Sequence, residues 1–200
     1  MRLILSKRVW LLTLFFWLGL IGVGYAWLLH YSFAPGKTNT APRRLPPDLA
    51  LAKPSTRAQL FVALHPRCPC SRATVRELAK IQNCAAAATD ITVLIYKPAD
   101  APDSWVEGAL LDDCRRMKCQ VRPDPEGRLA TSLGSLTSGG VVLYDRNGSL
   151  RYQGGITASR GHEGDNTGER AVIEILRGSR QTYRTMPVFG CPIQPEPTNR

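Results

Sequence analysis

Two cysteines separated by one proline, Cys68 and Cys70, are the residues of this chain best suited to chemistry. They follow a continuous apolar run over 59–64 and precede a segment with helical spacing, so they lie where a buried strand turns into a helix. A helix N-terminus carries roughly half a positive charge and unpaired N–H groups, which stabilise a thiolate. Pro69 suits the first helical position because it lacks the N–H that would be unpaired there. The pattern predicts a redox-active thiol at Cys68, the helix cap.

Neighbouring residues suggest roles within this site. Cys68 is expected to be the attacking thiolate, with Arg67 adding positive potential and His65 within reach as a base or charge partner. Cys70 then resolves the mixed disulfide. A Cys-x-Cys disulfide closes a smaller ring than Cys-x-x-Cys, and strained disulfides are more oxidising, so the pair favours shuffling or oxidation over strong reduction. The alternative is that each of the two cysteines forms a structural disulfide with a cysteine that is distant in the sequence.

The other four cysteines, Cys84, Cys114, Cys119 and Cys191, are expected to be structural staples or inert thiols. Six cysteines allow many complete pairings, so the disulfide connectivity stays open. A bridge from Cys114 to Cys119 is possible if a helix ends between them. Cys191 lies in a C-terminal tail that could fold back as a third thiol near the site, but a structural or inert role is favoured for it.

A Gly-rich loop around His162 precedes the last predicted helix. The favoured interpretation is a solvated loop in which Asn166 caps that helix. The alternative is a metal site made of Cys68, Cys70 and His162, since thiolate and imidazole ligands suit Cu(I) or zinc. No cofactor is therefore the main expectation, and copper is the alternative.

An uncharged apolar stretch over 9–29 predicts one membrane-spanning helix, because its length is close to the ~20 residues that cross a bilayer core. A cleavable signal peptide is the rival, with a small-x-small site at 24–26, but the apolar run continues past that site. The basic residues within 1–8 place this end in the cytoplasm. The expected location is the bacterial inner membrane, with a single pass and the C-terminal domain on the periplasmic side.

The chain is basic, with a formal net charge of +10. Its Lys and Arg residues are dispersed and no aromatic-interleaved basic stripe occurs, so nucleic acid is not an expected partner. A basic surplus suits a domain tethered beside an anionic bilayer. After the anchor, the composition predicts a Pro-rich linker over 30–57, one folded domain over 58–180 and a C-terminal tail over 181–200.

The folded domain is predicted to be α/β, with parallel crossovers first and an antiparallel hairpin later. The elements are expected at 59–64 (strand), 71–83 (helix), 91–96 (strand), 104–116 (helix), 119–124 (short strand and loop), 129–136 (short helix or turn), 140–144 and 149–153 (hairpin strands), and 166–178 (helix). The continuous apolar runs indicate strands covered on both faces.

Several motifs fit this order. They are the apolar span, Phe61-Val-Ala-Leu followed by Cys68-Pro-Cys-Ser-Arg-Ala, Asp124-Pro-Glu-Gly-Arg-Leu-Ala, and Val141-Val-Leu-Tyr-Asp-Arg-Asn-Gly-Ser-Leu-Arg-Tyr-Gln-Gly-Gly. Together they resemble membrane-anchored, extracytoplasmic thioredoxin-like proteins of the TlpA and ResA kind, and with segments 161–166 and 188–192 the chain is also similar to proteins labelled RedB. The resemblance implies a thioredoxin-like mixed sheet flanked by helices. It also implies a membrane-tethered thiol–disulfide oxidoreductase whose partners are protein thiols or disulfides and a redox donor.

The chain departs from that family in two places. The family has Cys-x-x-Cys, and its register here puts Ser71 at the second cysteine position. The family also has a cis-proline before its hairpin strand, where this chain reads Thr137-Ser138-Gly139-Gly140. In the family that proline shapes substrate docking and guards the thiols from metal. A copper-binding or metallochaperone domain is therefore the alternative function.

Overall fold

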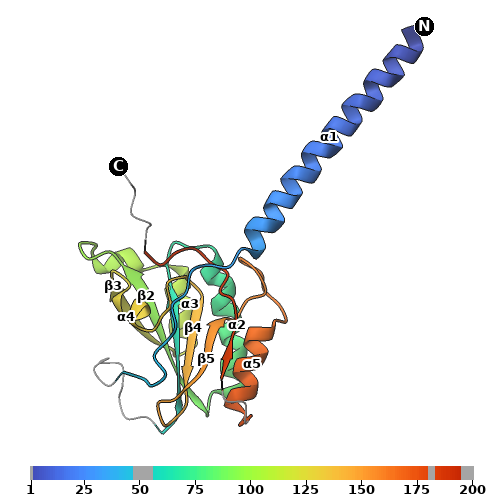
Figure 1. The fold of residues 1–200 in the computed structure, drawn as a ribbon. Coiled ribbons are helices and arrows are strands. Elements are labelled where there is room, and N and C mark those ends of the chain that lie inside the picture. The colour runs from blue at the N-terminus through green and yellow to red at the C-terminus, as the bar shows by residue number, and fades with distance from the viewer. Residues whose placement is uncertain (1, 47–55, 180–182, 195–200) are drawn as a thin grey trace. The chain divides into compact units, whose positions relative to one another are not determined.

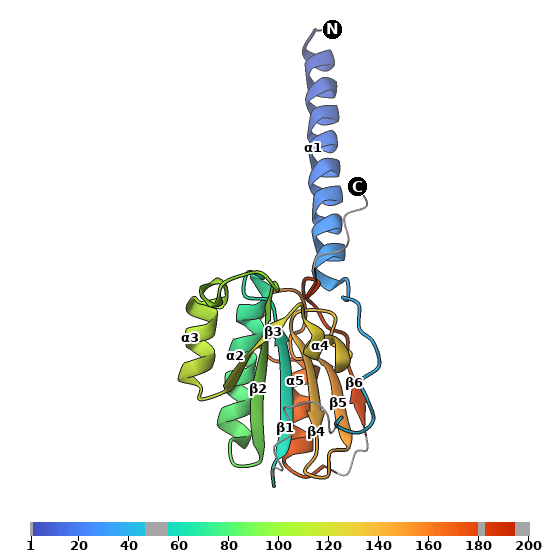
Figure 2. The same ribbon diagram turned by 90° about the vertical axis from the view of Figure 1, so that its left-hand side faces the viewer.

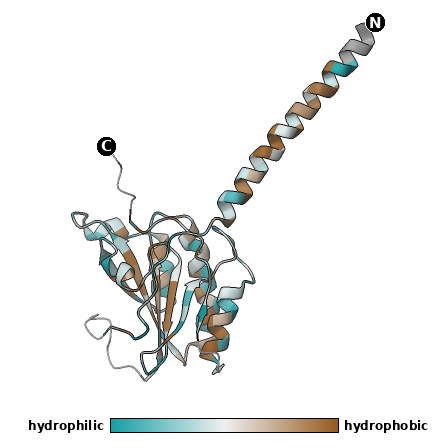
Figure 3. Cartoon of the chain, viewed as in Figure 1, coloured by the Kyte–Doolittle hydropathy of each residue, from teal (hydrophilic) through white to brown (hydrophobic). Residues whose placement is uncertain are grey.

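The computed structural model describes residues 2–46, 56–179 and 183–194, with only the backbone described at 2–6. The chain divides into two compact units, Met1–Ala34 and Pro35–Arg200. The first unit is the helix α1, Arg2–Phe33 (Figure 1). Over Lys7–Phe33 this helix is long and apolar enough to cross a membrane, a property that signal sequences share. Figure 3 shows hydrophobic residues along most of its length.

The second unit is built on one six-stranded sheet with the order β3-β2-β1-β4-β5-β6. The strands are β1 (Ala58–Leu64), β2 (Thr89–Lys97), β3 (Gln120–Pro125), β4 (Gly140–Tyr144), β5 (Leu150–Gly155) and β6 (Arg184–Thr185). β1 runs parallel to β2 and β2 parallel to β3, whereas β4 runs antiparallel to both β1 and β5. This arrangement confirms the predicted thioredoxin-like mixed sheet.

Helices flank both faces of the sheet. They are α2 (Cys70–Ala85), the short 3₁₀ helix η1 (Asp103–Val106), α3 (Ala109–Arg116), α4 (Arg128–Ser132) and α5 (Thr167–Leu176). Figure 2 shows α4 on one side of the sheet and α5 on the other. The sheet therefore has no described face open to solvent along its central strands, which explains their continuous apolar sequences.

Alternate residues of β1 supply two separate cores. Leu60 and Val62 pack with apolar side chains of α2, α3 and α5 on one face, and all are buried. Phe61 and Ala63 pack on the other face with residues of α4 and of irregular segments near both ends of the unit. Because side chains alternate along a strand, β1 is fixed from both sides. The Cys-Pro-Cys segment follows closely after this strand, so its position is set by β1.

The compact unit extends beyond the predicted 58–180 at both ends. Ala41, within the predicted linker, is 2 % exposed, and its N–H donates to Gln153 Oε1 at 2.9 Å. The described residues 35–46 thus lie against the domain, while 47–55 lie outside the described residues. A Pro-rich segment lacks regular structure but still packs where its side chains meet an apolar face.

The predicted tail likewise joins the fold. β6 pairs with β5, and Val188 and Ile193 are each only 2 % exposed. Residues 181, 182 and 195–200 lie outside the described part of the chain. The burial of these two apolar side chains holds the intervening segment, including Cys191, against the loop before β4, where the Ser138 N–H donates to the Cys191 carbonyl.

Three local features bear on the elements predicted from the sequence. The helix predicted over 104–116 is divided into η1 and α3 because Gly108, with φ at 147°, interrupts the helical backbone. α5 begins as predicted, with the side chain of Asn166 accepting a hydrogen bond from the Glu169 N–H at 2.8 Å. The predicted hairpin also forms, and Gly148 in its turn has φ at 72°.

Candidate redox site

Three thiols meet beside the C-terminal end of β1. Cys68 and Cys70 come from the junction of β1 and α2, and Cys191 comes from the C-terminal segment. Their Sγ atoms all lie within 4.8 Å of one another. Cys68 and Cys70 are 5 % and 8 % exposed, Cys191 is partly exposed, and all three are free thiols. The structure therefore adds a third sulfur to the predicted pair.

The start of α2 places backbone donors around Cys68. Pro69 already has helical backbone angles, with φ at −61° and ψ at −29°. The Ser71 N–H donates to the Cys68 carbonyl at 3.1 Å, which closes the first turn. The N-cap residue of α2 is Pro69 and the regular helix begins at Cys70, so Cys68 lies one residue before the cap position that was predicted for it. The N–H groups of Cys70 and Ser71 also hydrogen-bond the Cys68 sulfur.

Ionisation of the three thiols is unequal. Burial raises the pKa of Cys68, but hydrogen bonds from the Cys191 thiol and from backbone N–H groups outweigh it, so that the pKa is lowered. Burial and the neighbouring Cys68 raise the pKa of Cys70. Burial, together with the hydrogen bond to Cys68, raises the pKa of Cys191 to about 12. Cys68 is therefore the thiol that ionises first.

His65 and Arg67 lie against aromatic side chains. The His65 ring stacks on Tyr96 with 5.1 Å between ring centroids, and its Nδ1 accepts a hydrogen bond from the Arg67 N–H at 3.2 Å. The Arg67 guanidinium carbon lies 4.4 Å from the centroid of Trp105, in a cation–π contact. Burial and the charge of Arg67 lower the pKa of His65. Among the described residues, neither side chain belongs to the sulfur cluster, and their catalytic roles stay predictions.

Two buried serines connect the Cys-Pro-Cys junction to the loop before β4. Ser71 Oγ donates to the His65 carbonyl at 2.9 Å, and Ser138 Oγ lies 2.9 Å from Ser71 Oγ. The His65 N–H donates to Ser138 Oγ at 2.9 Å. If Ser138 donates to Ser71, every hydroxyl in this closed set has a partner. The Ser71 side chain thus holds the start of α2 to the end of β1 and to the loop before β4.

Cys191 is held by close backbone packing. The Ser138 N–H donates to the Cys191 carbonyl at 2.8 Å, and the Arg160 side chain donates to the Gly190 carbonyl. A Cβ added to Gly190 would lie 1.9 Å from the Ser138 carbonyl oxygen, so only glycine permits this approach. The sequence prediction favoured a structural or inert Cys191. The Gly-Cys-Pro sequence was the only local sign that this thiol reaches the site.

His162 is exposed in the loop before α5. It does not belong to the cluster that Cys68 and Cys70 form among the described residues, where Cys191 is the third member. The metal site with His162 stays a prediction, and the arrangement that the structure assembles is one of three sulfurs. The loop otherwise has the predicted role, since Asn166 caps α5.

The remaining cysteines lie away from this cluster. Cys84 is exposed on α2. Burial raises the pKa of Cys114 to about 12 and that of Cys119 to about 11, so both stay protonated near neutral pH. The Cys119 N–H donates to the Cys114 carbonyl at 3.2 Å, and the thiols are free. Their properties fit the inert alternative.

A cleft of about 380 Å³ opens beside Cys68. Its lining combines positive charge from Arg67 and Arg72 with apolar surface from Leu110 and the negative charge of Glu107. A larger cavity of about 810 Å³ lies near the start of β1 and the β4–β5 turn, and no cysteine lines it. The smaller cleft is the better candidate for a partner, because it leads to the ionisable thiol.

No protein-family model matches the chain, and a search of curated proteins found no match. Solved structures with similar folds include an uncharacterised conserved protein from Geobacillus kaustophilus, at 16 % identity and a TM-score of 0.57. That similarity covers 84 % of this chain and 96 % of the other. A hypothetical protein from Sinorhizobium meliloti 1021 has 20 % identity and a TM-score of 0.56, with coverage of 83 % and 98 %. At these identities the likeness concerns the fold alone.

Proposed function

We propose that this protein is a membrane-tethered thiol–disulfide oxidoreductase that acts on extracytoplasmic protein thiols or disulfides. Cys68 is the nucleophile and Cys70 the resolving cysteine. The observation that supports this best is the placement of Cys68, a buried thiol at a strand-to-helix junction with other thiols within 4.8 Å. Its hydrogen-bond donors favour the thiolate, which is the reactive form in disulfide exchange.

The reaction proceeds in two exchanges. The Cys68 thiolate attacks one sulfur of a partner's disulfide, so that a mixed disulfide forms and the partner's other sulfur leaves as a thiolate and takes up a proton. Cys70 then loses its proton and attacks the Cys68 sulfur, which forms the Cys68–Cys70 disulfide and releases the partner's second thiol. The partner gains two electrons and the site loses two. The reverse sequence oxidises a partner dithiol, and a separate redox donor or acceptor resets the pair.

Surrounding residues assist these exchanges. Cys191 stabilises the Cys68 thiolate through its thiol hydrogen. His65 serves as a proton acceptor, since burial and Arg67 lower its pKa and keep the imidazole neutral near neutral pH. The partner approaches through the cleft, whose Arg67 and Arg72 favour a segment with acidic residues.

The tether is α1. Its apolar sequence over Lys7–Phe33 supports an uncleaved anchor in the bacterial inner membrane. The basic residues that precede the apolar stretch favour a cytoplasmic N-terminus, which puts the thioredoxin-like domain on the periplasmic side. That location permits disulfide chemistry, because the periplasm is oxidising.

The full chain in detergent, equilibrated with glutathione buffers of increasing oxidation, tests the proposal. Mass spectrometry of peptides reports the redox state of each cysteine after the thiols are blocked. We expect Cys68 and Cys70 to interconvert between dithiol and disulfide as one two-electron couple, and Cys84→Ser to leave that couple unchanged. Failure of Cys68 and Cys70 to form a reversible disulfide would refute the assignment of the pair.

A further inference from the structure

The proposed disulfide exchange uses two cysteines of this chain as its reacting thiols, whereas three cysteines meet at the site. The Sγ atoms of Cys68, Cys70 and Cys191 lie within 4.8 Å of one another, and no imidazole or carboxylate of the described residues joins that cluster. We propose that the three thiolates bind one Cu(I) ion in trigonal coordination. The site goes beyond the proposed redox function, because it uses Cys191 as a ligand and requires no exchange of disulfides.

The spacing of the sulfurs suits a single metal ion. Three sulfurs placed around a metal at about 2.3 Å, the length of a zinc–thiolate bond, lie about 4.0 Å from one another in a trigonal plane. The three sulfurs here lie within 4.8 Å of one another as free thiols. Closing around an ion therefore needs each pair to approach by less than about 1 Å, which side-chain rotation supplies.

The ligand set discriminates among metals. Thiolates are soft ligands and select Cu(I), whereas Mg²⁺ and Ca²⁺ require oxygen ligands. Zinc also binds thiolates, but structural zinc sites have four protein ligands in a tetrahedron. The described part of the chain supplies three such ligands. Three sulfurs without a fourth ligand favour Cu(I).

Positive charge beside the three cysteines offsets the negative charge that the copper complex would carry. Three thiolates and one Cu(I) carry a net charge of −2, which burial makes costly unless it is compensated. The positive charge of Arg160 acts on the sulfurs of both Cys70 and Cys191. Its side chain also donates to the Gly190 carbonyl, which fixes it beside the segment that carries Cys191. The N-terminus of α2 adds backbone donors to Cys68.

Anaerobic competition between the reduced full chain in detergent and the Cu(I) chelator bathocuproine disulfonate tests the proposal. We expect one Cu(I) per chain and an X-ray absorption spectrum with three sulfur neighbours at about 2.3 Å. Cys191→Ser should weaken binding by more than the roughly 10–100-fold that follows loss of an outer partner of a metal ligand. Arg160→Gln should weaken it within that range and keep three sulfur neighbours.

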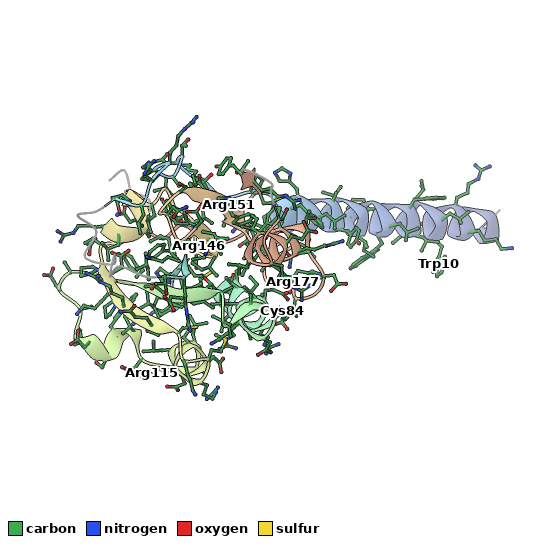
Figure 4. The ribbon with its side chains drawn as sticks, turned by 90° about the horizontal axis from the view of Figure 1, so that it is seen from below. Trp10, Cys84, Arg115, Arg146, Arg151 and Arg177 are labelled. Carbon is green, nitrogen blue, oxygen red and sulfur yellow. The ribbon has the colours of Figure 1, made fainter. Side chains whose placement is uncertain are left out.

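Cys84→Ser is the matched control, since Cys84 lies exposed on the same helix as Cys70 (Figure 4). It should leave Cu(I) affinity unchanged. Equal affinities of the parent chain and Cys191→Ser, two sulfur neighbours in the parent spectrum, or displacement of Cu(I) by equimolar zinc would each overturn the proposal. The spectrum of the parent chain counts the sulfur neighbours without any variant, so it tests the copper proposal even if Cys191→Ser misfolds. The Cu(I) measurement and the glutathione titration are separate experiments, so the copper proposal and the redox proposal can each fail without the other.

Discussion

Replacing Cys191 by alanine should raise the pKa of Cys68. In the structure, the Cys191 thiol donates a hydrogen bond that favours the Cys68 thiolate. Alanine removes this donor, while the backbone N–H groups of Cys70, Ser71 and residue 191 remain. Cys191→Ser keeps a side-chain donor in the form of a hydroxyl. The alanine variant should therefore raise the pKa of Cys68 more than the serine variant does.

The size of the effect follows from the strength of the lost hydrogen bond. A hydrogen bond to a charged group contributes about 1.5–3 kcal/mol, and a thiol is a weak donor, so the lower end applies. At about 1.4 kcal/mol per pKa unit, the pKa of Cys68 rises by about 1 unit. The fraction of thiolate at pH values below the pKa then falls about tenfold. The smaller side chain also exposes Cys68, which relieves desolvation and acts in the opposite direction.

The assay is the pH dependence of iodoacetamide alkylation at Cys68, followed by peptide mass spectrometry on the full chain in detergent. The midpoint should move to higher pH in Cys191→Ala and move less in Cys191→Ser. Cys84→Ala provides the control, because Cys84 is exposed and lies outside the cluster. An unchanged or lowered midpoint in Cys191→Ala would show that the Cys191 thiol does not stabilise the thiolate.

Three further predictions concern other parts of the site and the fold. Cys70→Ser should keep early alkylation of Cys68 at mildly acidic pH and trap mixed disulfides, whereas Cys68→Ser should abolish both; trapping only in Cys68→Ser, seen on non-reducing gels, would reverse their roles. Burial and the neighbouring Glu77 raise the pKa of Glu169, so the free energy of unfolding should fall as pH rises from about 4.5 through the raised value; urea titrations of Glu169→Gln should lack that fall, and an identical pH profile would contradict this. Gly190→Ala should destabilise the chain by about 1–3 kcal/mol in urea unfolding, because its Cβ would lie 1.9 Å from a carbonyl oxygen in the loop before β4; unchanged stability would count against this packing.

Local sequence was enough to predict much of the fold. The run over 59–64 is continuously apolar because β1 is covered on both faces, and Asn166 caps α5 through a hydrogen bond spanning three residues. Cys68 and Cys70 are close in space because they are close in sequence. Such features depend on backbone geometry over a few residues. The spacing of apolar and polar side chains along the sequence therefore indicates them. The division of the segment 104–116 at Gly108 was not predicted, since its apolar spacing is helical on both sides.

Tertiary structure alone decided which distant groups complete the site. Cys191 joins Cys68 because Val188 and Ile193 are buried and the Gly190 backbone packs against the loop before β4. Arg160, from the loop between β5 and α5, also reaches this segment, where its side chain donates to the Gly190 carbonyl. The spacing of apolar residues along a sequence indicates which face of a helix or strand is buried. It does not indicate which distant segment covers that face. The sequence therefore determined the candidate pair and the elements that hold it, whereas long-range packing determined the third thiol, whose hydrogen bond helps to lower the pKa of Cys68.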